Sequence, residues 1–138
     1  MTVRFADAEP NGLADLVGRL IETNLEAEPD RRALLRDTVV LLTASDAATE
    51  ATVAVSSSGV AVSNGPPAGR RPHLVIVSEA YDLIELAGAP LRFGFPDALH
   101  PRGRAVIRRI ATRRVRVSGM LCHPIRLSRF TRLLSVVP

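Results

Sequence analysis

The chain has 138 residues, the size of one ordinary domain, which excludes two large domains. Hydrophobic residues make up 46% of it, but aromatic residues only 4% with no Trp, so the core must consist mainly of Val, Leu, Ile and Ala, as in a β-sheet covered by leucine-rich helices. All 18 basic residues are arginine, and residues 98–138 hold ten of them and no acid, which indicates either an anionic partner or a solvated basic surface.

The first 36 residues predict two helices. Apolar residues recur at spacings of three and four across residues 13–21, and Asn11 precedes them as a candidate N-cap. Pro29 interrupts this pattern, and a second, short helix is expected to begin near Asp30.

Three strands are predicted next, from the stretches TVVLLTAS, ATVAVSS and VAVSNG. In the second stretch Val53 and Val55 alternate with small or polar residues, and in the third Val60 and Val62 do the same. The two stretches are separated by a Ser-Ser-Gly turn. We therefore expect a hairpin with one apolar and one polar face.

Strands and helices alternate in the rest of the chain. After an exposed, proline-rich loop at residues 63–72, HLVIVS predicts a strand and SEAYDLIELAG a helix from a Ser78 cap to Gly88. Residues 89–103 read as an irregular loop, followed by a helix (PRGRAVIRRIAT), a strand (RRVRVS) and a terminal helix (PIRLSRFTRLLSVV). Clustered strands with helices at the ends predict an α+β fold with a largely antiparallel sheet.

The last strand and the terminal helix both segregate charge from apolar side chains. In the strand, Val115 and Val117 point to one face and the intervening arginines to the other. The helix carries an apolar stripe and a basic flank, formed respectively by Leu127, Phe130, Leu134 and Val137 and by Arg126, Arg129 and Arg132. This stripe either closes a filled core or covers a cavity.

A family resemblance favours the cavity. Residues 37–137 resemble the sterol carrier protein type 2 family in the order of three stretches, TVVLLTASDAATEATVAVSSSGVAVSNG, PHLVIVSEAYDLIELAGAPL and RRVRVSGMLCHPIRLSRFTRLLSVV. The resemblance implies a largely antiparallel sheet of about five strands backed by helices, with the C-terminal helix covering an apolar tunnel for a sterol, fatty acid or fatty acyl-CoA. Two positions depart from the family pattern: Arg113 replaces a glycine before the last strand, and His73 replaces an acidic residue before the fourth strand.

This resemblance and the apolar faces give a set of candidate ligand-binding residues. They are Phe93, Phe95, Val115, Val117, Met120, Leu121, Leu127, Phe130 and Leu134. The two loop phenylalanines either plug the open end of the core or line a ligand entrance, and the resemblance favours the entrance.

The basic face is a candidate surface for docking onto anionic membranes. We expect Arg114, Arg116, Arg126 and Arg129 to form it. Nucleic acid ranks lower as a partner, because single-strand binders interleave aromatic residues for base stacking. Only Phe130 lies beyond Phe95 here.

Motifs for catalysis or for metal and cofactor binding are not found. His73, His100, His123 and the lone Cys122 lack paired-ligand spacing. The stretch GPPAGRR lacks the Lys-Ser/Thr ending of a phosphate loop, and neither GxSxG nor HExxH occurs. We expect a protein that is not an enzyme and that needs no metal or cofactor.

The sequence thus predicts a single domain over residues 1–138 that binds an apolar ligand. Transfer of this ligand is a further candidate role. A lone cysteine and apolar runs too short to span a bilayer fit a cytoplasmic protein. The alternative is an interaction domain with a filled core, whose basic C-terminal face binds protein, anionic membrane or nucleic acid. The identity of the ligand and the oligomeric state are left open.

Overall fold

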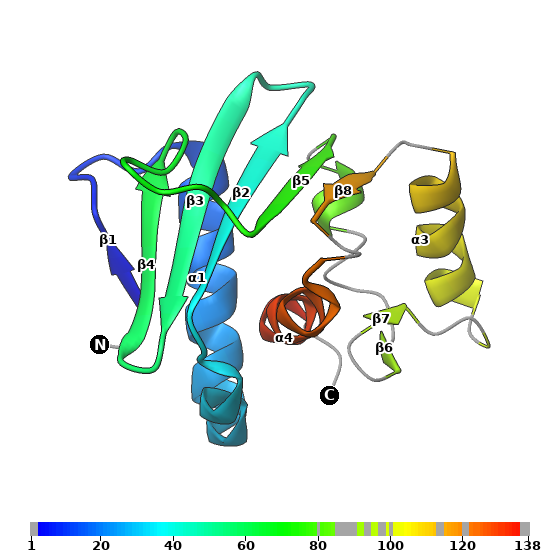
Figure 1. Ribbon diagram of the computed structural model, residues 1–138, viewed down its shortest axis with the longest axis horizontal. Helices are drawn as coiled ribbons and strands as arrows, with labels where there is room; N and C mark the ends of the chain where they lie inside the picture. The colour runs from blue at the N-terminus through cyan, green and yellow to red at the C-terminus, as the bar shows by residue number, and fades with distance from the viewer. Residues whose placement is uncertain are drawn as a thin grey trace.

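A six-stranded sheet with helices behind it forms the body of the molecule (Figure 1). The computed structural model describes residues 3–79, 81–84, 91–92, 95–96, 99, 101–112, 115–119 and 122–135. Its elements in chain order are β1 (Val3–Phe5), α1 (Gly12–Ala27), the 3₁₀ helix η1 (Pro29–Leu34), β2 (Thr38–Ala44), β3 (Thr49–Ser56), β4 (Gly59–Asn64), β5 (Leu74–Ser78), β6 (Leu91–Arg92), β7 (Phe95–Pro96), α3 (Pro101–Ala111), β8 (Arg116–Ser118) and α4 (Pro124–Leu134).

The strands of the large sheet lie in the order β1-β4-β3-β2-β5-β8. Three neighbouring pairs are antiparallel, and two, β1 with β4 and β2 with β5, are parallel. The register aligns Val53 with Val40 on one side and with Val62 on the other, so three valines stand side by side on the core face. The predicted α+β fold with a largely antiparallel sheet and a C-terminal helix is confirmed.

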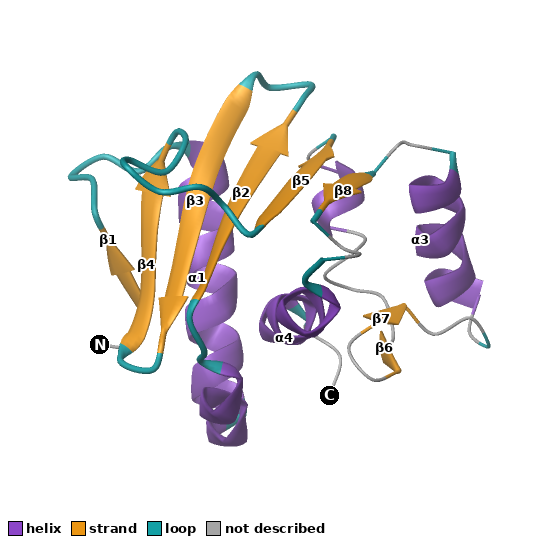
Figure 2. Ribbon diagram, in the orientation of Figure 1, coloured by secondary structure: helices purple, strands orange, loops and turns teal. Residues whose placement is uncertain are grey.

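The connection from β4 to β5 crosses the sheet. Strands β4 and β5 both run in the same direction as β2. The chain must therefore pass back across β3 and β2 to reach the start of β5. Residues 65–73 make this crossing on the face away from α1, as Figure 2 shows. The Thr52 hydroxyl donates a hydrogen bond of 2.8 Å to the Gly65 carbonyl and so fixes the start of the crossing. The expected proline-rich loop is therefore the crossover of the fold.

The cap of α1 ties this helix to the sheet. The side-chain oxygen of Asn11 accepts a 2.8 Å bond from the Ala14 N–H, as the sequence predicted for an N-cap. The Asn11 side-chain amide also donates to the Glu50 carbonyl, and its backbone N–H donates to the Asn64 side chain, each at 2.8 Å. The cap thus positions α1 against β3 and β4 as well as starting the helix.

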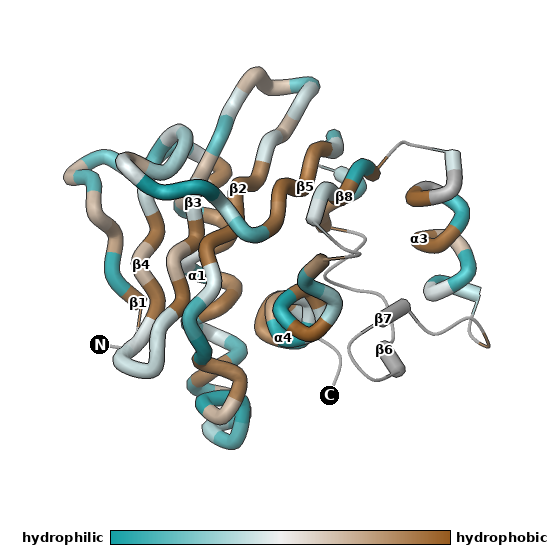
Figure 3. Tube along the Cα trace, viewed as in Figure 1, coloured by the Kyte–Doolittle hydropathy of each residue, from teal (hydrophilic) through white to brown (hydrophobic). Residues whose placement is uncertain are grey.

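One hydrophobic core joins the sheet to α1 and α4. Figure 3 shows hydrophobic residues concentrated along β2 and β5. The core members on α1 and α4 are Leu13, Ala14, Val17, Ile21, Leu25, Leu127, Phe130, Leu133 and Leu134. Helix α4 contacts both α1 and η1. The apolar stripe of the terminal helix therefore packs into this core.

Two predictions of local structure need correction. The N-terminal strand β1 was not expected from the sequence, and it extends the sheet by pairing Val3 with Val60. The irregular loop expected at residues 89–103 contains a two-stranded sheet, in which Arg92 pairs with Phe95. The helix expected after Ser78 is seen at residues 81–84, whereas residues 85–90 are outside the described part.

No helix in the described residues combines the length and the apolar character needed to cross a bilayer.

Candidate ligand-binding site

Five of the nine predicted ligand-binding residues lie in one apolar cluster. Val115, Leu127, Phe130 and Leu134 are each at most 5% exposed, and Val117 is half-buried and packs against them. The cluster is formed by the start of β8, the inner face of α4 and the core face of the sheet. The structure thus brings together the strand and helix faces whose patterns predicted an apolar site.

The other four predicted residues cannot be placed in this cluster. Phe93, Met120 and Leu121 lie outside the described residues. The backbone of Phe95 belongs to β7, but its side chain is outside the described part. The entrance role of Phe93 and Phe95 and the ligand contacts of Met120 and Leu121 stay predictions.

Polar contacts anchor α4 at its C-terminal end. The buried side-chain amide of Asn24 donates a 2.8 Å bond to the Leu133 carbonyl. Arg31 donates to the carbonyls of Arg132, at 2.9 Å, and of Ser135. These bonds satisfy carbonyls that the end of a helix leaves without intrahelical partners. They hold the end of α4 against α1 and η1, so this end serves as a fixed wall of the core.

Exposed apolar side chains gather in the segment between β5 and β8. Tyr81, Ile84, Leu99 and Ile107 are exposed by 60%, 54%, 72% and 39%. In the same segment Val106 is buried in a small cluster separate from the main core. These exposed side chains are candidates for contact with an apolar ligand or with a partner.

The predicted arginine surface divides into two places. Arg116 is exposed on the sheet face away from α1, opposite Val77 of β5. Arg126 and Arg129 instead line a pocket at the start of α4, and Arg114 is outside the described residues. Among the described residues, Arg126 and Arg129 line this pocket together, whereas Arg116 does not line it.

The pocket at the start of α4 has a volume of about 420 Å³. Three arginines, Arg36, Arg126 and Arg129, line it, together with Asp37 and the first residues of α4. Arg126 donates a hydrogen bond to the backbone carbonyl of Asp37. The Asp37 carboxylate in turn pairs with Arg70 at 3.4 Å. The pocket wall is consequently cationic. The sequence pattern missed the contribution of Arg36 because Arg36 is distant from α4 along the chain.

His73, which directly precedes β5, contacts both β2 and the residue before α4. Its Nδ1 accepts a 2.9 Å bond from the Val39 N–H, and its ring lies edge-on to that of His123 with 5.3 Å between centroids. Burial lowers the pKa of His73 below its usual value, and the charge of Arg126 lowers it further, followed by smaller effects of His123 and Arg70. Asp37 acts in the opposite direction. The fold therefore favours the neutral form of His73, in which Nδ1 accepts from the Val39 N–H.

Acidification should destabilise the protein through His73. In the unfolded chain the imidazole titrates near 6.5, whereas in the fold its pKa is lower, so the unfolded state binds more protons between these two values. The free energy of unfolding should fall as the pH drops below about 6.5. His73→Asn keeps an acceptor for the Val39 N–H but cannot titrate, so its unfolding free energy should fall less. Denaturant unfolding from pH 7.5 to 5 would measure this, with all other ionisable groups shared by both proteins. Parallel curves for the two proteins would contradict the assignment.

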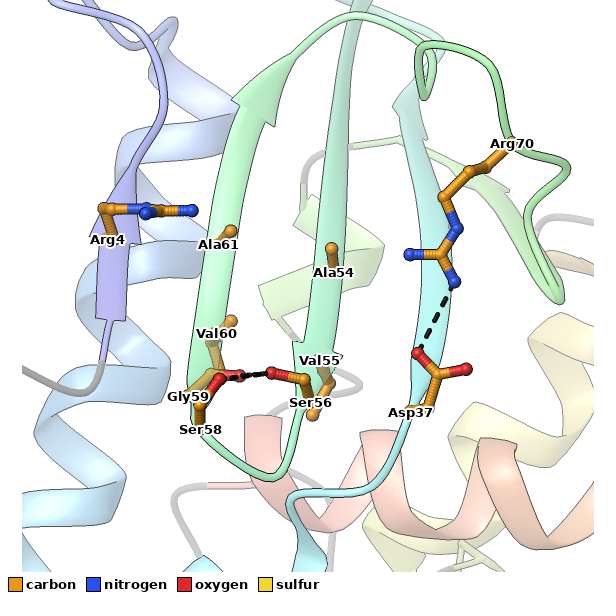
Figure 4. A pocket seen from close by; sticks show the side chains of 10 residues that line it. All are labelled: Arg4, Asp37, Ala54, Val55, Ser56, Ser58, Gly59, Val60, Ala61 and Arg70. Atoms are coloured by element: carbon orange, nitrogen blue, oxygen red, sulfur yellow. Dashed lines mark hydrogen bonds and ion pairs between the residues drawn. The ribbon is translucent and has the colours of Figure 1, made fainter.

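A second pocket lies on the open face of the sheet. Its volume is about 310 Å³, and the small side chains of Ala54 and Ala61 form part of its floor. Figure 4 shows Arg4 extending from β1 toward Ala61, while Arg70 stands on the other side with its ion pair to Asp37. Because Arg70 is already paired, this pocket has less free positive charge than the pocket at the start of α4.

Metal-binding groups do not assemble in the described residues. No group of three His, Cys, Asp or Glu side chains there could hold a metal ion. Cys122 is a free, exposed thiol beside His123. Asp82 is only 1% exposed. The sequence did not predict this burial, because an acid near the start of a helix is favoured by the helix dipole whether it is buried or exposed.

Comparison with known proteins identifies the fold. No family model matches the chain, and no curated protein matches it in sequence. A solved structure described as "UbiJ-SCP2 Ubiquinone synthesis protein" is similar to it, with a TM-score of 0.60 and 17% sequence identity, over 88% of this chain and 92% of that one. The chain therefore has the fold of the sterol carrier protein type 2 domains, as the resemblance implied.

Proposed function

We propose that this chain, folded like a sterol carrier protein type 2 domain, is a non-enzymatic binder of an apolar molecule of the sterol, fatty acid or fatty acyl-CoA class. The proposal includes transfer of this ligand between membranes by the protein, which would be located in the cytoplasm. The observation that carries it is the presence of exposed apolar side chains at residues 81–107, in a fold that also brings the apolar faces of β8 and α4 into one cluster.

The physical basis is burial of the ligand rather than polar recognition. Each methylene removed from water contributes about 0.8 kcal/mol, so an acyl chain needs few directional contacts. Tyr81, Ile84, Leu99 and Ile107 are exposed by 39% or more in the ligand-free chain. Covering these side chains with ligand would bury apolar surface on both partners. Specificity among apolar molecules should therefore be broad.

A carried ligand is the most direct evidence for this function. Native mass spectrometry of gently purified protein should show added mass corresponding to a sterol or an acyl compound. Extraction and identification of that compound would define the ligand class. Ligand-free protein that also fails to change the fluorescence of acyl and sterol probes would favour the alternative function described below.

A matched pair of variants tests where the ligand lies. Ile107 and Leu16 are similarly exposed, at 39% and 41%, but only Ile107 belongs to the proposed apolar surface, since Leu16 lies on α1. Ile107→Gln should weaken binding of a fluorescent acyl probe by about tenfold, because a polar amide would be desolvated against the chain. Leu16→Gln should leave the probe affinity unchanged. Equal affinities of the two variants would place the probe elsewhere.

A second candidate function is an interaction domain with a filled core. It is favoured by the burial of Leu127, Phe130 and Leu134 within the main apolar cluster. In this case the exposed apolar side chains would contact a protein partner, and the arginines an anionic membrane or a nucleic acid. The protein could dock onto an anionic bilayer through Arg116, Arg126 and Arg129 under either candidate function.

A further inference from the structure

We infer that the pocket at the start of α4 is a binding site for a phosphate group. This inference goes beyond the apolar-ligand proposal and does not depend on it. It rests on the convergence of three guanidinium groups from two chain segments on one cavity of about 420 Å³.

The arginines of this pocket are available for a ligand. Arg126 and Arg129 are three residues apart on α4 and so lie on one side of the helix, while Arg36 reaches the pocket from the residue before Asp37. Within the described residues, Arg36 and Arg129 form no ion pair. Arg126 uses one N–H on the Asp37 carbonyl, and a guanidinium has five.

The charges around the pocket leave this cationic group largely uncompensated. The one carboxylate that lines it belongs to Asp37, which already pairs with Arg70 at 3.4 Å. Helix α4 contributes no acid, because residues 98–138 contain none. Three guanidiniums against one shared carboxylate match the double negative charge of a phosphate monoester better than the single charge of a carboxylate.

The first turn of α4 adds donors of the same polarity. Pro124 stands at the start of the helix, and no side chain caps the following amides. The N–H groups of Ile125 and Arg126 belong to the first helical turn, where donors have no intrahelical partner, and the helix dipole there favours an anion. These groups supplement the arginines, which carry the inference.

The rim of the pocket indicates what the phosphate is attached to. Ile125 is 65% exposed and lines the same pocket as the arginines. An apolar side chain beside a cationic cavity suits an amphiphile, with its phosphate in the pocket and its apolar part across Ile125. A free phosphate would use the same guanidinium groups without the apolar contact.

The experiment compares two double variants that remove the same charge. Inorganic phosphate is titrated by calorimetry at constant ionic strength, with chloride as the competing anion. Arg126→Gln with Arg129→Gln should weaken phosphate binding by about tenfold or more, because two charge-assisted donors are lost. Arg32→Gln with Arg108→Gln removes two exposed arginines outside the pocket and should bind phosphate like the unaltered protein.

A further single variant guards against loss of folding. Arg126 also bonds to the Asp37 carbonyl, so its removal disturbs the structure as well as the charge. Arg36→Gln breaks no hydrogen bond seen in the described residues and should still reduce phosphate affinity. Equal weakening in the pocket and control double variants would reduce the effect to diffuse charge and overturn the inference. Absence of phosphate binding by the unaltered protein would also overturn it.

Vesicles distinguish the two sources of phosphate. If the occupant is an amphiphile, the protein should sediment with phosphatidylcholine vesicles that contain phosphatidic acid and not with phosphatidylcholine alone, and Ile125→Gln should reduce this binding. Binding of inorganic phosphate without vesicle binding would assign the site to a soluble phosphate compound. A protein that shifts duplex DNA but binds neither phosphate nor phosphatidic acid would have a nucleic-acid surface instead, contrary to the inference.

Discussion

Replacing Phe130 with alanine is expected to lower the free energy of unfolding by about 3–5 kcal/mol. The Phe130 side chain is 1% exposed and lies in the main core cluster, on a helix that contacts both α1 and η1. Alanine would remove the ring and leave a cavity that the anchored helix cannot collapse to fill. Denaturant-induced unfolding, followed by circular dichroism, measures the change.

Ile125→Ala is the matched control for this prediction. Ile125 lies on the same helix but is 65% exposed, so removal of its side chain should change the unfolding free energy by less than about 1 kcal/mol. A similarly small loss for Phe130→Ala would mean that Phe130 borders empty space, as expected for a wall of an open ligand tunnel.

Probe binding by the Phe130→Ala protein separates the two candidate functions. If α4 covers a ligand, enlarging the apolar space beneath it should change the affinity for acyl probes of different length. If α4 only completes a filled core, stability falls and the probe affinities stay the same. The stability and binding measurements on this variant are therefore informative together.

The sequence predicted most of the secondary structure because the relevant patterns are local. The cap at Asn11, the alternating valines of β3 and β4 and the apolar stripe of α4 each depend on residues only a few positions apart. Strand β1 was missed because three residues carry no periodicity, and its stability depends on pairing with distant β4. Neither the patterns nor the family resemblance specified the order of the strands in the sheet, because that order depends on pairing between distant segments.

The candidate sites were less predictable because they depend on tertiary contacts. The alternation of Val115 and Val117 correctly indicated an inner face of β8. It could not indicate that Arg36 approaches Arg126 and Arg129, since the segment between η1 and β2 must pack against α4 before these residues meet. His73 stood out only as a departure from the family pattern, and its contacts with Val39 and His123 appear only in the fold.

Gly119, which follows β8, closely approaches the backbone of His73. Its backbone has φ +89, and a Cβ there would lie 2.2 Å from the His73 carbonyl oxygen. Gly119→Ala should therefore combine the strain of a left-handed conformation, about 1–2 kcal/mol, with overpacking of about 1–3 kcal/mol. We expect a total loss of roughly 2–5 kcal/mol in unfolding free energy, measured in denaturant.

Gly65→Ala separates these two contributions. Gly65 also has positive φ, +73, but no atom lies within 4 Å of the position its Cβ would occupy. Its replacement should cost only the strain of about 1–2 kcal/mol. Equal losses for the two variants would show that the contact between Gly119 and His73 does not limit the fold.

The consequences of Gly119→Ala should extend to the phosphate pocket. The Gly119 carbonyl accepts a 2.8 Å bond from the His123 N–H, and His123 immediately precedes α4. Moving β8 away from His73 would also move this bond, the edge-on contact between the two histidines and the first turn of α4. Gly119→Ala should consequently reduce both the pH dependence assigned to His73 and the affinity for inorganic phosphate, whereas Gly65→Ala should alter neither. Loss of stability with both properties unchanged would mean that the start of α4 is positioned independently of β8.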